Sequence, residues 1–442
     1  MHNNKERPYT LTLLNGDLSL QVLQFNGHEA LNQPYRFEIE VIGLAPAINL
    51  DRLLQQPVFF SFADEQGVHG IIHSASREHR GTQRIDYRLV LVPWLQNLDR
   101  QRSRRVFHQL NVPAILRQLL EENGLPEDSY RLELPDGRYP ARPFCIQFDE
   151  SDLTFLQRLC EEEGIHYHFE HRRDGHVLVL ADDSQSFPEE PLLMRFQGDT
   201  SAGEQGPVIS ELFQRHTSPP HCVPPAPPPL DHERLSRRIL ERLRCRQGQL
   251  QGRSNQSALR SGALLQVSEH PLPHFNDQWL LIEIRHQGQQ PSILERRATD
   301  RARHYSNQFT ALVWSTVFRP ALTHARPAIP GFQAARVLGP VGEPAPLDEQ
   351  GRVKVRLWPT TQSADNEADG FWIPMVVATP HSRVDPQSLP MAGSDVLVSF
   401  LDSDPDRPVL YAAASNPPRP RPGRQPKGDD RLLFDWLLNR KA

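Results

Sequence analysis

Apolar and polar residues alternate along most of the first hundred positions, the pattern of half-buried β-strands. Leu11 and Leu13 alternate with polar residues, and the alternation resumes at Leu18 after the turn-forming Asn-Gly-Asp at 15–17. This arrangement predicts a hairpin. Further strands are predicted at 35–39, 58–62, 70–74 and 85–92. Many short strands at regular spacing favour a barrel or a sandwich, and we assign residues 1–104 to a first β-barrel.

The pattern changes to helical spacing in residues 105–200, which we assign to an α+β insert. A first helix is predicted to begin after Asn111 and to end before Gly124, because a capping residue precedes the apolar stripe and a glycine follows it. A second helix is predicted over 151–163. Its apolar face consists of Leu153, Leu156, Leu159 and Cys160. Strands are predicted at 165–169 and 177–180.

Alternation returns in residues 201–330, which we assign to a second β-barrel. This part begins with a proline-rich loop at 218–230, and a helix is predicted from His232 to about Arg246. Strands are predicted at 264–267, 279–284 and 309–318. The segment 21–37 is echoed faintly at 266–281, which indicates two similar barrels on either side of the insert.

Five short strands are predicted in residues 331–415, at 336–338, 352–357, 371–378, 395–400 and 409–412. Five strands in so short a stretch fit a small OB-like barrel. Residues 416–428 are rich in proline and arginine and predict an extended linker.

The last segment, residues 429–442, predicts an apolar helix that docks on a partner. Its apolar residues are Leu432, Leu433, Phe434, Trp436, Leu437 and Leu438. These are too many for one face of a solvated helix, and the segment is too short to be stably helical alone. Two alternatives are that this helix folds back onto its own barrel or joins copies of the chain in a coil.

Composition excludes several classes of protein. The chain has 442 residues with 49 Lys and Arg against 54 Asp and Glu, a net charge of -5, which argues against nucleic-acid binding. No apolar run is long enough for a membrane span, and the polar N-terminus lacks the apolar core of a signal peptide. We therefore expect folding in the cytoplasm. The four cysteines, Cys145, Cys160, Cys222 and Cys245, form no zinc pattern and are expected to be buried or idle thiols.

Three groups of residues are candidates for chemistry, and each has a simpler interpretation. His166, His168, His171 and His176 could bind zinc or copper, but no cysteine or carboxylate completes the pattern, so exposed, hydrogen-bonded strand histidines are expected. Glu161–Glu163 are consecutive and point around the predicted helix, so a solvated face is expected instead of a glycosidase pair. Asp402, Asp404 and Asp406 are expected to form a polar turn. With no catalytic motif, the sequence predicts no enzyme activity, no cofactor and no metal site.

Several segments, taken in order, resemble one family, the VgrG spike proteins of type VI secretion, which are similar to the hub and spike proteins of contractile phage tails. The clearest is FCIQFDESDLTFLQRLCEEEGIHYHFEH at 144–171, followed by HVLVLADD at 176–183. The others are RLRCRQGQLQGRSN at 242–255, VSEHP at 267–271, FRPALTHARPAIPGFQAARVLGP at 318–340, DEQGRVKVRLWP at 348–359 and SFLDSDPDRPVL at 399–410. The resemblance covers about residues 9–415.

The resemblance implies a mainly β, trimeric protein in which paired tail-hub β-barrels carry an α+β insert and an OB-like barrel. It implies that the trimer seats on a hexameric tube of Hcp-like protein, contacts other baseplate components and carries a spike-tip or effector protein. Assembly in the cytoplasm and injection without a signal peptide are expected. The family's β-helical needle does not follow residue 415, so we expect the needle to be missing, replaced or supplied by another chain.

Two other classes of function stay open at the level of sequence. The first is a soluble adaptor or carrier that uses the same barrels without forming a needle. The second is an effector enzyme, which the lack of a spare domain disfavours.

Overall fold

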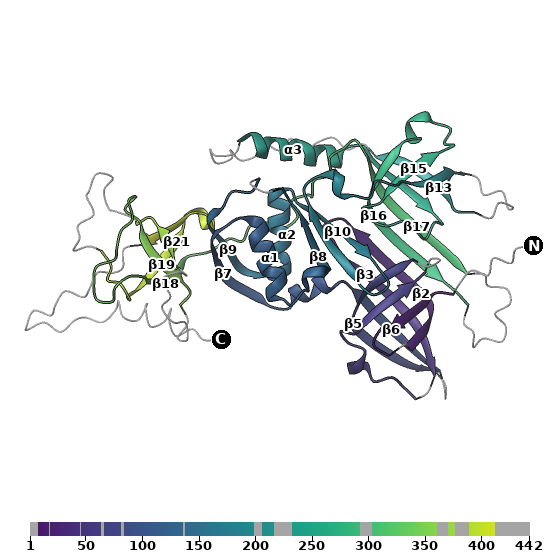
Figure 1. Cartoon of the computed structure of the whole chain (residues 1–442), viewed down its shortest axis with the longest axis horizontal. Helices are drawn as coiled ribbons and strands as arrows, with labels where there is room; N and C mark the ends of the chain where they lie inside the picture. Colours follow the sequence, from purple (N-terminus) through teal and green to yellow (C-terminus); the bar gives the residue numbers. More distant parts are fainter. Residues whose placement is uncertain are drawn as a thin grey trace, which may run out of the picture. The chain divides into compact units, whose positions relative to one another are not determined.

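The computed structural model describes residues 8–16, 18–44, 46–62, 66–80, 84–135, 138–198, 206–215, 232–291, 303–359, 370–375 and 389–411 (Figure 1). The chain divides into two compact units. The first consists of residues 1–99, 116–138 and 156–324, and the second of residues 100–115, 139–155 and 325–442. Each unit is described by itself below.

A closed ring of six antiparallel strands begins the first unit. The strands are β1 (Thr10–Leu13), β2 (Leu18–Ala30), β3 (Gln33–Leu44), β4 (Pro57–Ser61), β5 (Gly67–Arg80) and β6 (Arg84–Val92). Their order is β1-β4-β5-β6-β3-β2, and β1 pairs with β2 to close the ring. The hairpin predicted at 15–17 is confirmed, because Leu13 pairs with Leu18 across it.

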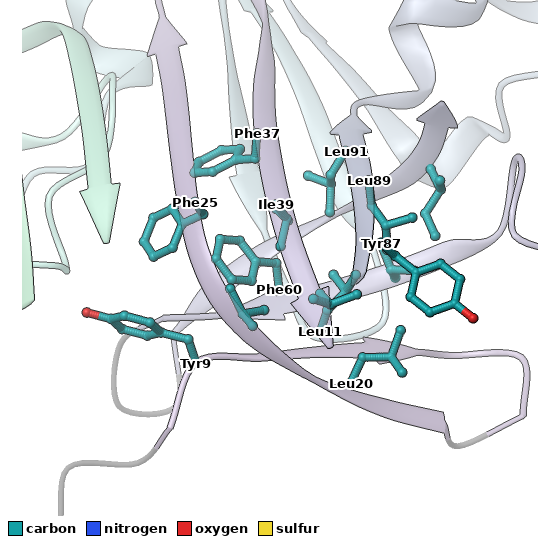
Figure 2. Packing of buried hydrophobic residues seen from close by; sticks show 14 of the residues in the cluster. Tyr9, Leu11, Leu20, Phe25, Phe37, Ile39, Phe60, Tyr87, Leu89 and Leu91 are labelled. Atoms are coloured by element: carbon teal, nitrogen blue, oxygen red, sulfur yellow. The ribbon is translucent and has the colours of Figure 1, made fainter. Parts of the chain in front are cut away.

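Alternate residues of these strands point inward and fill the barrel with aromatic and branched side chains (Figure 2). Phe25 lies near the middle of this packing, with its ring 5.3 Å from that of Tyr9 and 4.8 Å from that of Phe60, both edge to face. Phe37 packs edge to face on Phe60 at 5.8 Å. Such edge-to-face pairs are favoured by the ring quadrupoles, so the interior is a solid core.

A second ring of six strands completes the β-structure of this unit. The strands are β12 (Leu192–Phe196), β13 (Val208–Arg215), β14 (Gln249–Ser254), β15 (Leu264–Ser268), β16 (Gln278–Gln289) and β17 (His304–Val313). Their order is β16-β15-β12-β13-β14-β17, and the pairing of β16 with β17 closes the ring. Short β12 is the exception to antiparallel pairing, because it runs parallel to both β13 and β15.

The two echoed sequence segments each lie in an antiparallel pair of strands of their own ring. Residues 21–37 lie in β2 and β3, and residues 266–281 lie in β15 and β16. The two-barrel architecture that the echo indicated is therefore present. The strand predicted at 309–318 lies five residues earlier, because β17 begins at His304 and ends at Val313.

Three helices and a small sheet also occur among the described residues. The helices are α1 (Val112–Glu122), α2 (Asp152–Glu163) and α3 (His232–Arg246), and the sheet has the order β10 (His166–His171), β11 (His176–Ala181), β8 (Tyr130–Glu133). Asn111 Oδ1 accepts a hydrogen bond from Ala114 N at 2.9 Å, which caps α1 as predicted. Gly124 and Gly164 follow α1 and α2 with φ of 75° and 76°, the left-handed conformation that ends helices.

The second unit contains a five-stranded antiparallel sheet with the order β20-β19-β18-β21-β22. Its strands are β18 (Phe332–Val337), β19 (Val353–Leu357), β20 (Phe371–Ile373), β21 (Asp395–Phe400) and β22 (Pro408–Tyr411). Met375 forms a parallel bridge with Leu410, which brings the two edges of the sheet together and nearly closes a barrel. The predicted five-stranded OB-like barrel is confirmed.

A two-stranded ribbon, β7 (Arg102–Leu110) paired with β9 (Arg142–Ser151), belongs to the same unit. Ile146 and Phe148 of β9 are buried in one core with the five-stranded barrel. Arg104 and Asp149 join the two strands of the ribbon by a bidentate ion pair of 2.7 and 2.9 Å. The predicted domain boundaries at 104, 200, 330 and 415 stay predictions.

Short 3-10 turns connect several elements. They are η1 (Leu50–Arg52), η2 (Trp94–Asp99), η3 (Glu127–Ser129), η4 (Ser184–Ser186), η5 (Pro273–Phe275) and η9 (Leu401–Ser403). Within the described ranges, no helix has both the length and the apolar character needed to cross a membrane.

Candidate functional site: the seam between the two rings

The predicted docking residues lie outside the part of the chain that the structure describes. They are Leu432, Leu433, Phe434, Trp436, Leu437 and Leu438, and the linker 416–428, the loop 218–230 and Cys222 also lie outside it. The partner-binding role of the C-terminal segment therefore stays a prediction.

The two six-stranded rings are joined along one pair of strands, which we call the seam. β2 of the first ring pairs antiparallel with β16 of the second, from Gln24 opposite Gln289 to Ala30 opposite Glu283. The side chain of Gln290 adds to this pairing. Its Oε1 accepts from Tyr9 N at 2.8 Å, and its Nε2 donates to Tyr9 O at 2.9 Å and to Val22 O. One continuous sheet therefore runs from ring to ring.

Each seam strand carries a glycine that leaves room for an aromatic side chain of the strand next to it. Gly27 lies opposite Phe37, and Gly288 lies opposite Phe25. A Cβ atom at either glycine would overlap the ring of that aromatic partner. Any larger residue at Gly27 or Gly288 would therefore displace the phenylalanine side chain that covers it.

A buried chain of polar groups crosses the seam beneath these strands. Glu29 of β2 is 3% exposed, and its Oε1 lies 3.1 Å from Nε2 of His286 on β16 and 3.9 Å from Nε of Arg260. The guanidinium of Arg260 also lies 4.6 Å above the ring of Phe62. A carboxylate of the first ring is thus held by two nitrogen groups of the second.

Further contacts extend this chain. Asn307 Nδ2 donates to Tyr305 Oη at 3.1 Å, and this hydroxyl lies 2.7 Å from His286 Nδ1. The other imidazole nitrogen, Nε2, faces Glu29. The chain of contacts therefore runs from Asn307 through Tyr305 and His286 to Glu29.

The pKa values of Glu29 and His286 are both shifted in this environment. Burial alone would raise the pKa of Glu29, but the contact with His286 and the charge of Arg260 lower it to about 2. Burial lowers the pKa of His286 below its ordinary value, although Glu29 opposes this effect. The seam therefore carries one buried negative charge, and this charge is compensated only when both rings are in place.

A second polar node fixes the segment 317–324, which is the last part of the first unit. Glu161 of α2 is 4% exposed and accepts hydrogen bonds from Thr323 N at 2.8 Å, His324 N at 2.9 Å, and both of their side chains. Arg319 Nε lies 2.6 Å from Glu241 of α3. The prediction that Glu161–Glu163 form a solvated face is therefore wrong.

The physical reason is that each of these glutamates has a cationic or amide partner, either on α2 itself or on a neighbouring segment. Glu162 pairs with Arg158 at 3.1 Å with side-chain exposures of 12% and 4%, and Glu163 pairs with Arg238 of α3 at 2.9 Å. Their consecutive positions do point them around the helix, as expected, but α3 and the segment 317–324 cover that side.

His166, His168 and His176 are buried and His171 is half-buried, so the prediction that these histidines are exposed is wrong. His166 is 1% and His168 3% exposed, and the ring of Phe187 stacks on His166 at 4.6 Å and lies tilted against His168 at 5.2 Å. His166 Nε2 is hydrogen-bonded to Ser186 Oγ at 2.9 Å, whereas neither nitrogen of His168 has a hydrogen-bond partner among the described residues. These two imidazoles therefore share an aromatic stack with Phe187 and do not converge on one point.

His176 joins a different cluster, around Tyr35. Its Nδ1 lies 2.9 Å from His69 Nδ1 and 3.3 Å from Tyr35 Oη, while its Nε2 accepts from Trp94 N at 3.3 Å. Burial lowers the pKa of His69 to about 4, so this pair is neutral. In the described part of the chain, no three His, Cys, Asp or Glu side chains converge as metal ligands would.

The remaining candidates behave as the simpler interpretations predict. Cys145, Cys160 and Cys245 are buried. Asp402 pairs with Arg407 at 2.7 Å, Asp406 pairs with Arg326 at 2.8 Å, and Asp404 accepts from Asp406 N at 3.0 Å. These contacts make the polar turn that was expected.

Sequence reasoning missed the seam, although a signal for it was present. In β2 the residues Phe25, Gly27 and Glu29 share one face by strand alternation, and in β16 the residues Ile284 and His286 do so. A glutamate and a histidine at inward positions of otherwise apolar strands indicate a buried pair.

The described residues thus form two fused six-stranded rings and a nearly closed five-stranded barrel. The chain belongs to the phage tail baseplate hub family (GPD), whose profile matches residues 28–223 and 216–292.

Within this family, the chain is similar to spike proteins of type VI secretion. The chain is 36% identical to the type VI secretion system spike protein VgrG4b of Pseudomonas aeruginosa, over 95% of this chain and 57% of that protein. It is also 36% identical to the spike protein VgrG5 of the same organism, over 96% of this chain and 60% of that one. The chain thus spans less than two thirds of the length of these relatives. The resemblance to VgrG proteins drawn from the sequence is confirmed.

Solved structures agree on the fold. The c3393 protein of E. coli, described as a component of the type VI secretion system with structural similarity to T4 tail proteins gp27 and gp5, aligns with a TM-score of 0.73. That alignment covers 90% of this chain and 98% of the other at 24% identity. The mainly β fold with paired hub barrels and an OB-like barrel is therefore confirmed.

Proposed function

We propose that this chain is the structural spike hub of a type VI secretion machine. In this proposal it forms a homotrimer, seats on a hexameric Hcp-like tube among the baseplate components, and carries a spike-tip or effector protein. It assembles in the cytoplasm and leaves through the machine.

The single observation that carries the proposal is the fusion of two six-stranded rings in one chain through β2 and β16. Three such chains contribute six rings, so a threefold trimer can match a sixfold tube. Matching requires the two rings of each chain to keep a fixed relative position. The buried compensation of Glu29 by His286 and Arg260 supports such a fixed position, because separating the rings would leave a buried charge without its partners.

The polar side chains of the seam support a structural role over catalysis. His286 uses Nδ1 for Tyr305 and directs Nε2 to Glu29, so neither nitrogen is available to activate a nucleophile. Thr323 and Glu161 both lie near His324 Nδ1, whereas a catalytic triad needs its two partners on opposite nitrogens of the imidazole. We therefore propose that the chain is no enzyme.

The C-terminal segment is proposed to bind the cargo. Its six large apolar residues at 432–438 follow a proline-rich linker, and burying each large side chain on a partner contributes roughly 1.5–3 kcal/mol. To test this, residues 416–442 are deleted, and in a second variant Trp436 and Leu437 are replaced by Ala. Asp435→Ala is the matched control in the same segment. Loss of a co-expressed spike-tip protein from both test variants but not from the control supports the proposal.

The trimer itself is tested by light scattering of the full chain at micromolar concentration. A mass of three chains supports the hub. A monomer with a native circular dichroism spectrum contradicts it and favours the alternative, a soluble adaptor or carrier with hub-like barrels.

A further inference from the structure

Helix α3 (His232–Arg246) contacts the rest of its unit through polar groups. Arg238 donates to Glu162 O at 3.1 Å and to Glu163 Oε2 at 2.9 Å. Arg242 donates to Pro320 O at 3.0 Å, and Cys245 Sγ to Val317 O at 3.3 Å. These three residues are spaced i, i+4 and i+7, so they form one face, and that face is the inward one.

The apolar stripe of α3 lies on a different face. Leu235, Ile239 and Leu243 follow one another at intervals of four residues. Leu235 borders the inward face, whereas Ile239 and Leu243 lie about a quarter of a turn or more away from it, with Leu240 beyond them. None of the four is buried in the chain, and Leu240 is 55% exposed. A helix on the surface of a globular protein normally turns its apolar stripe to the core. Here the stripe is left without a full cover by the described residues, and Figure 1 shows α3 outside both rings.

Exposed arginines border this stripe at its C-terminal end. Arg244 and Arg246 lie in the last turn of α3 and are both exposed. We call Leu240, Leu243, Arg244 and Arg246 the basic apolar patch. Its positive charge disfavours contact between two copies of α3, because like charges would then face each other.

A surface of complementary character occurs elsewhere in the same unit. Leu193 of β12 is 74% exposed, although its neighbour Met194 is buried. Glu189 and Glu190 precede it and are exposed. We call Glu189, Glu190 and Leu193 the acidic apolar patch.

Cyclic symmetry explains why one chain would carry both patches. In a closed ring of three copies each interface joins two different surfaces, one from each neighbour. We propose that the basic apolar patch of one copy docks on the acidic apolar patch of the next copy. Leu240 and Leu243 then pack against Leu193, and the arginines face the glutamates. This inference rests on the trimer proposed above and names the surfaces that build it.

Charge reversal with rescue tests the pairing of the two patches in the full chain. One variant carries Arg244→Glu and Arg246→Glu, a second carries Glu189→Arg and Glu190→Arg, and a third combines all four changes. The control carries Arg172→Glu and Arg173→Glu, two exposed arginines of the β10–β11 turn with the same change in charge as the first variant. Light scattering over a dilution series measures the concentration at which each trimer dissociates.

The first two variants should dissociate at concentrations more than about tenfold higher than the wild type, because each interface then faces like charges. The third variant should return to the wild-type profile, which a mere weakening of α3 could not produce, and the control should not change. Wild-type dilution profiles in both single-sided variants would overturn the proposed pairing while leaving the trimer intact. A monomeric wild type would overturn the proposed function, and this pairing with it.

Disulfide cross-linking tests the same pairing in case a charge variant fails to fold. In a background with Cys222→Ser, Leu240→Cys and Leu193→Cys are combined in one chain. Oxidation should give covalent dimers and trimers, whereas Leu240→Cys paired with Arg173→Cys should stay monomeric in a denaturing gel. Equal cross-linking of both pairs would contradict the proposal.

Discussion

Replacing Glu29 by glutamine should weaken the seam between the two rings more than any surface substitution of the same kind. Glu29 is buried, and its carboxylate lies 3.1 Å from His286 Nε2 and 3.9 Å from Arg260 Nε. Glutamine keeps the shape of the side chain and removes its charge. Arg260 and His286 then lose their anionic partner.

The expected cost follows from the pKa of Glu29. A pKa lowered from 4.5 to about 2 corresponds, at about 1.4 kcal/mol per pH unit, to roughly 3 kcal/mol of preference for the charged carboxylate in the folded chain. Breaking a buried pair by removing one partner typically costs about 3–5 kcal/mol. The two figures agree, and we expect a loss of about 3 kcal/mol near neutral pH.

Amide hydrogen exchange in β2 and β16 measures this loss locally, because it reports the free energy of opening of the seam strands themselves. Glu38→Gln is the matched control: Glu38 is exposed and pairs with Arg36 at 3.2 Å, so its substitution should cost under about 1 kcal/mol. The lowered pKa of Glu29 also sets how its contribution to stability changes with pH. The contribution of Glu29 is present above its ordinary pKa of 4.5 and is lost as the pH falls towards 2, so the difference between variant and wild type should shrink in acid.

Equal protection of β2 and β16 in Glu29→Gln and Glu38→Gln at neutral pH would refute the reasoning. A difference that stays constant down to pH 2 would show that the effect is one of shape and not of charge.

Three further predictions concern packing and acid stability. Gly288→Ala should cost about 1–3 kcal/mol, because its Cβ would overlap the Phe25 ring, whereas Gly175→Ala, with open space around it, should cost under about 0.5 kcal/mol in urea unfolding. Leu156→Ala should cost about 2–5 kcal/mol, because the buried side chain leaves a cavity. Glu162→Ala should cost about 1–3 kcal/mol, because buried Arg158 loses its carboxylate partner. A negligible effect of Glu162→Ala would restore the interpretation of 161–163 as a solvated face. Burial lowers the pKa of His69 and His168 to about 4. As the pH falls from about 6.5 to 4, the unfolded chain therefore binds protons that the folded chain does not, and the melting temperature should fall. A melting temperature that stays constant over this pH range would contradict the burial of these histidines as neutral groups.

Much of the fold could be predicted from the sequence, because its signals are local. The Asn-Gly turn at 15–16, the cap at Asn111 and the glycines at 124 and 164 mark the ends of elements through backbone conformation alone. Alternation along the strands set which side chains point inward. The five strands of the OB-like barrel were found for the same reason.

Burial of a polar residue at the seam was open to prediction from strand alternation, but the partners at the seam and at the Glu161 node were not, because they lie far apart in the sequence. Glu29 meets His286 across more than 250 positions, and Glu161 meets Thr323 and His324 across more than 160. Local polarity suggested a solvated face at 161–163 and exposed histidines on β10. Burial of both was imposed by neighbouring segments that local patterns do not identify.

The central claim is a threefold hub that matches a sixfold tube, and native mass spectrometry of the full chain mixed with a hexameric Hcp-like ring tests it most directly. The account predicts one complex of three chains with one hexamer, and no complex with the ring's dissociated subunits. A complex of one chain per hexamer, or free chains beside intact rings at micromolar concentration, would contradict it.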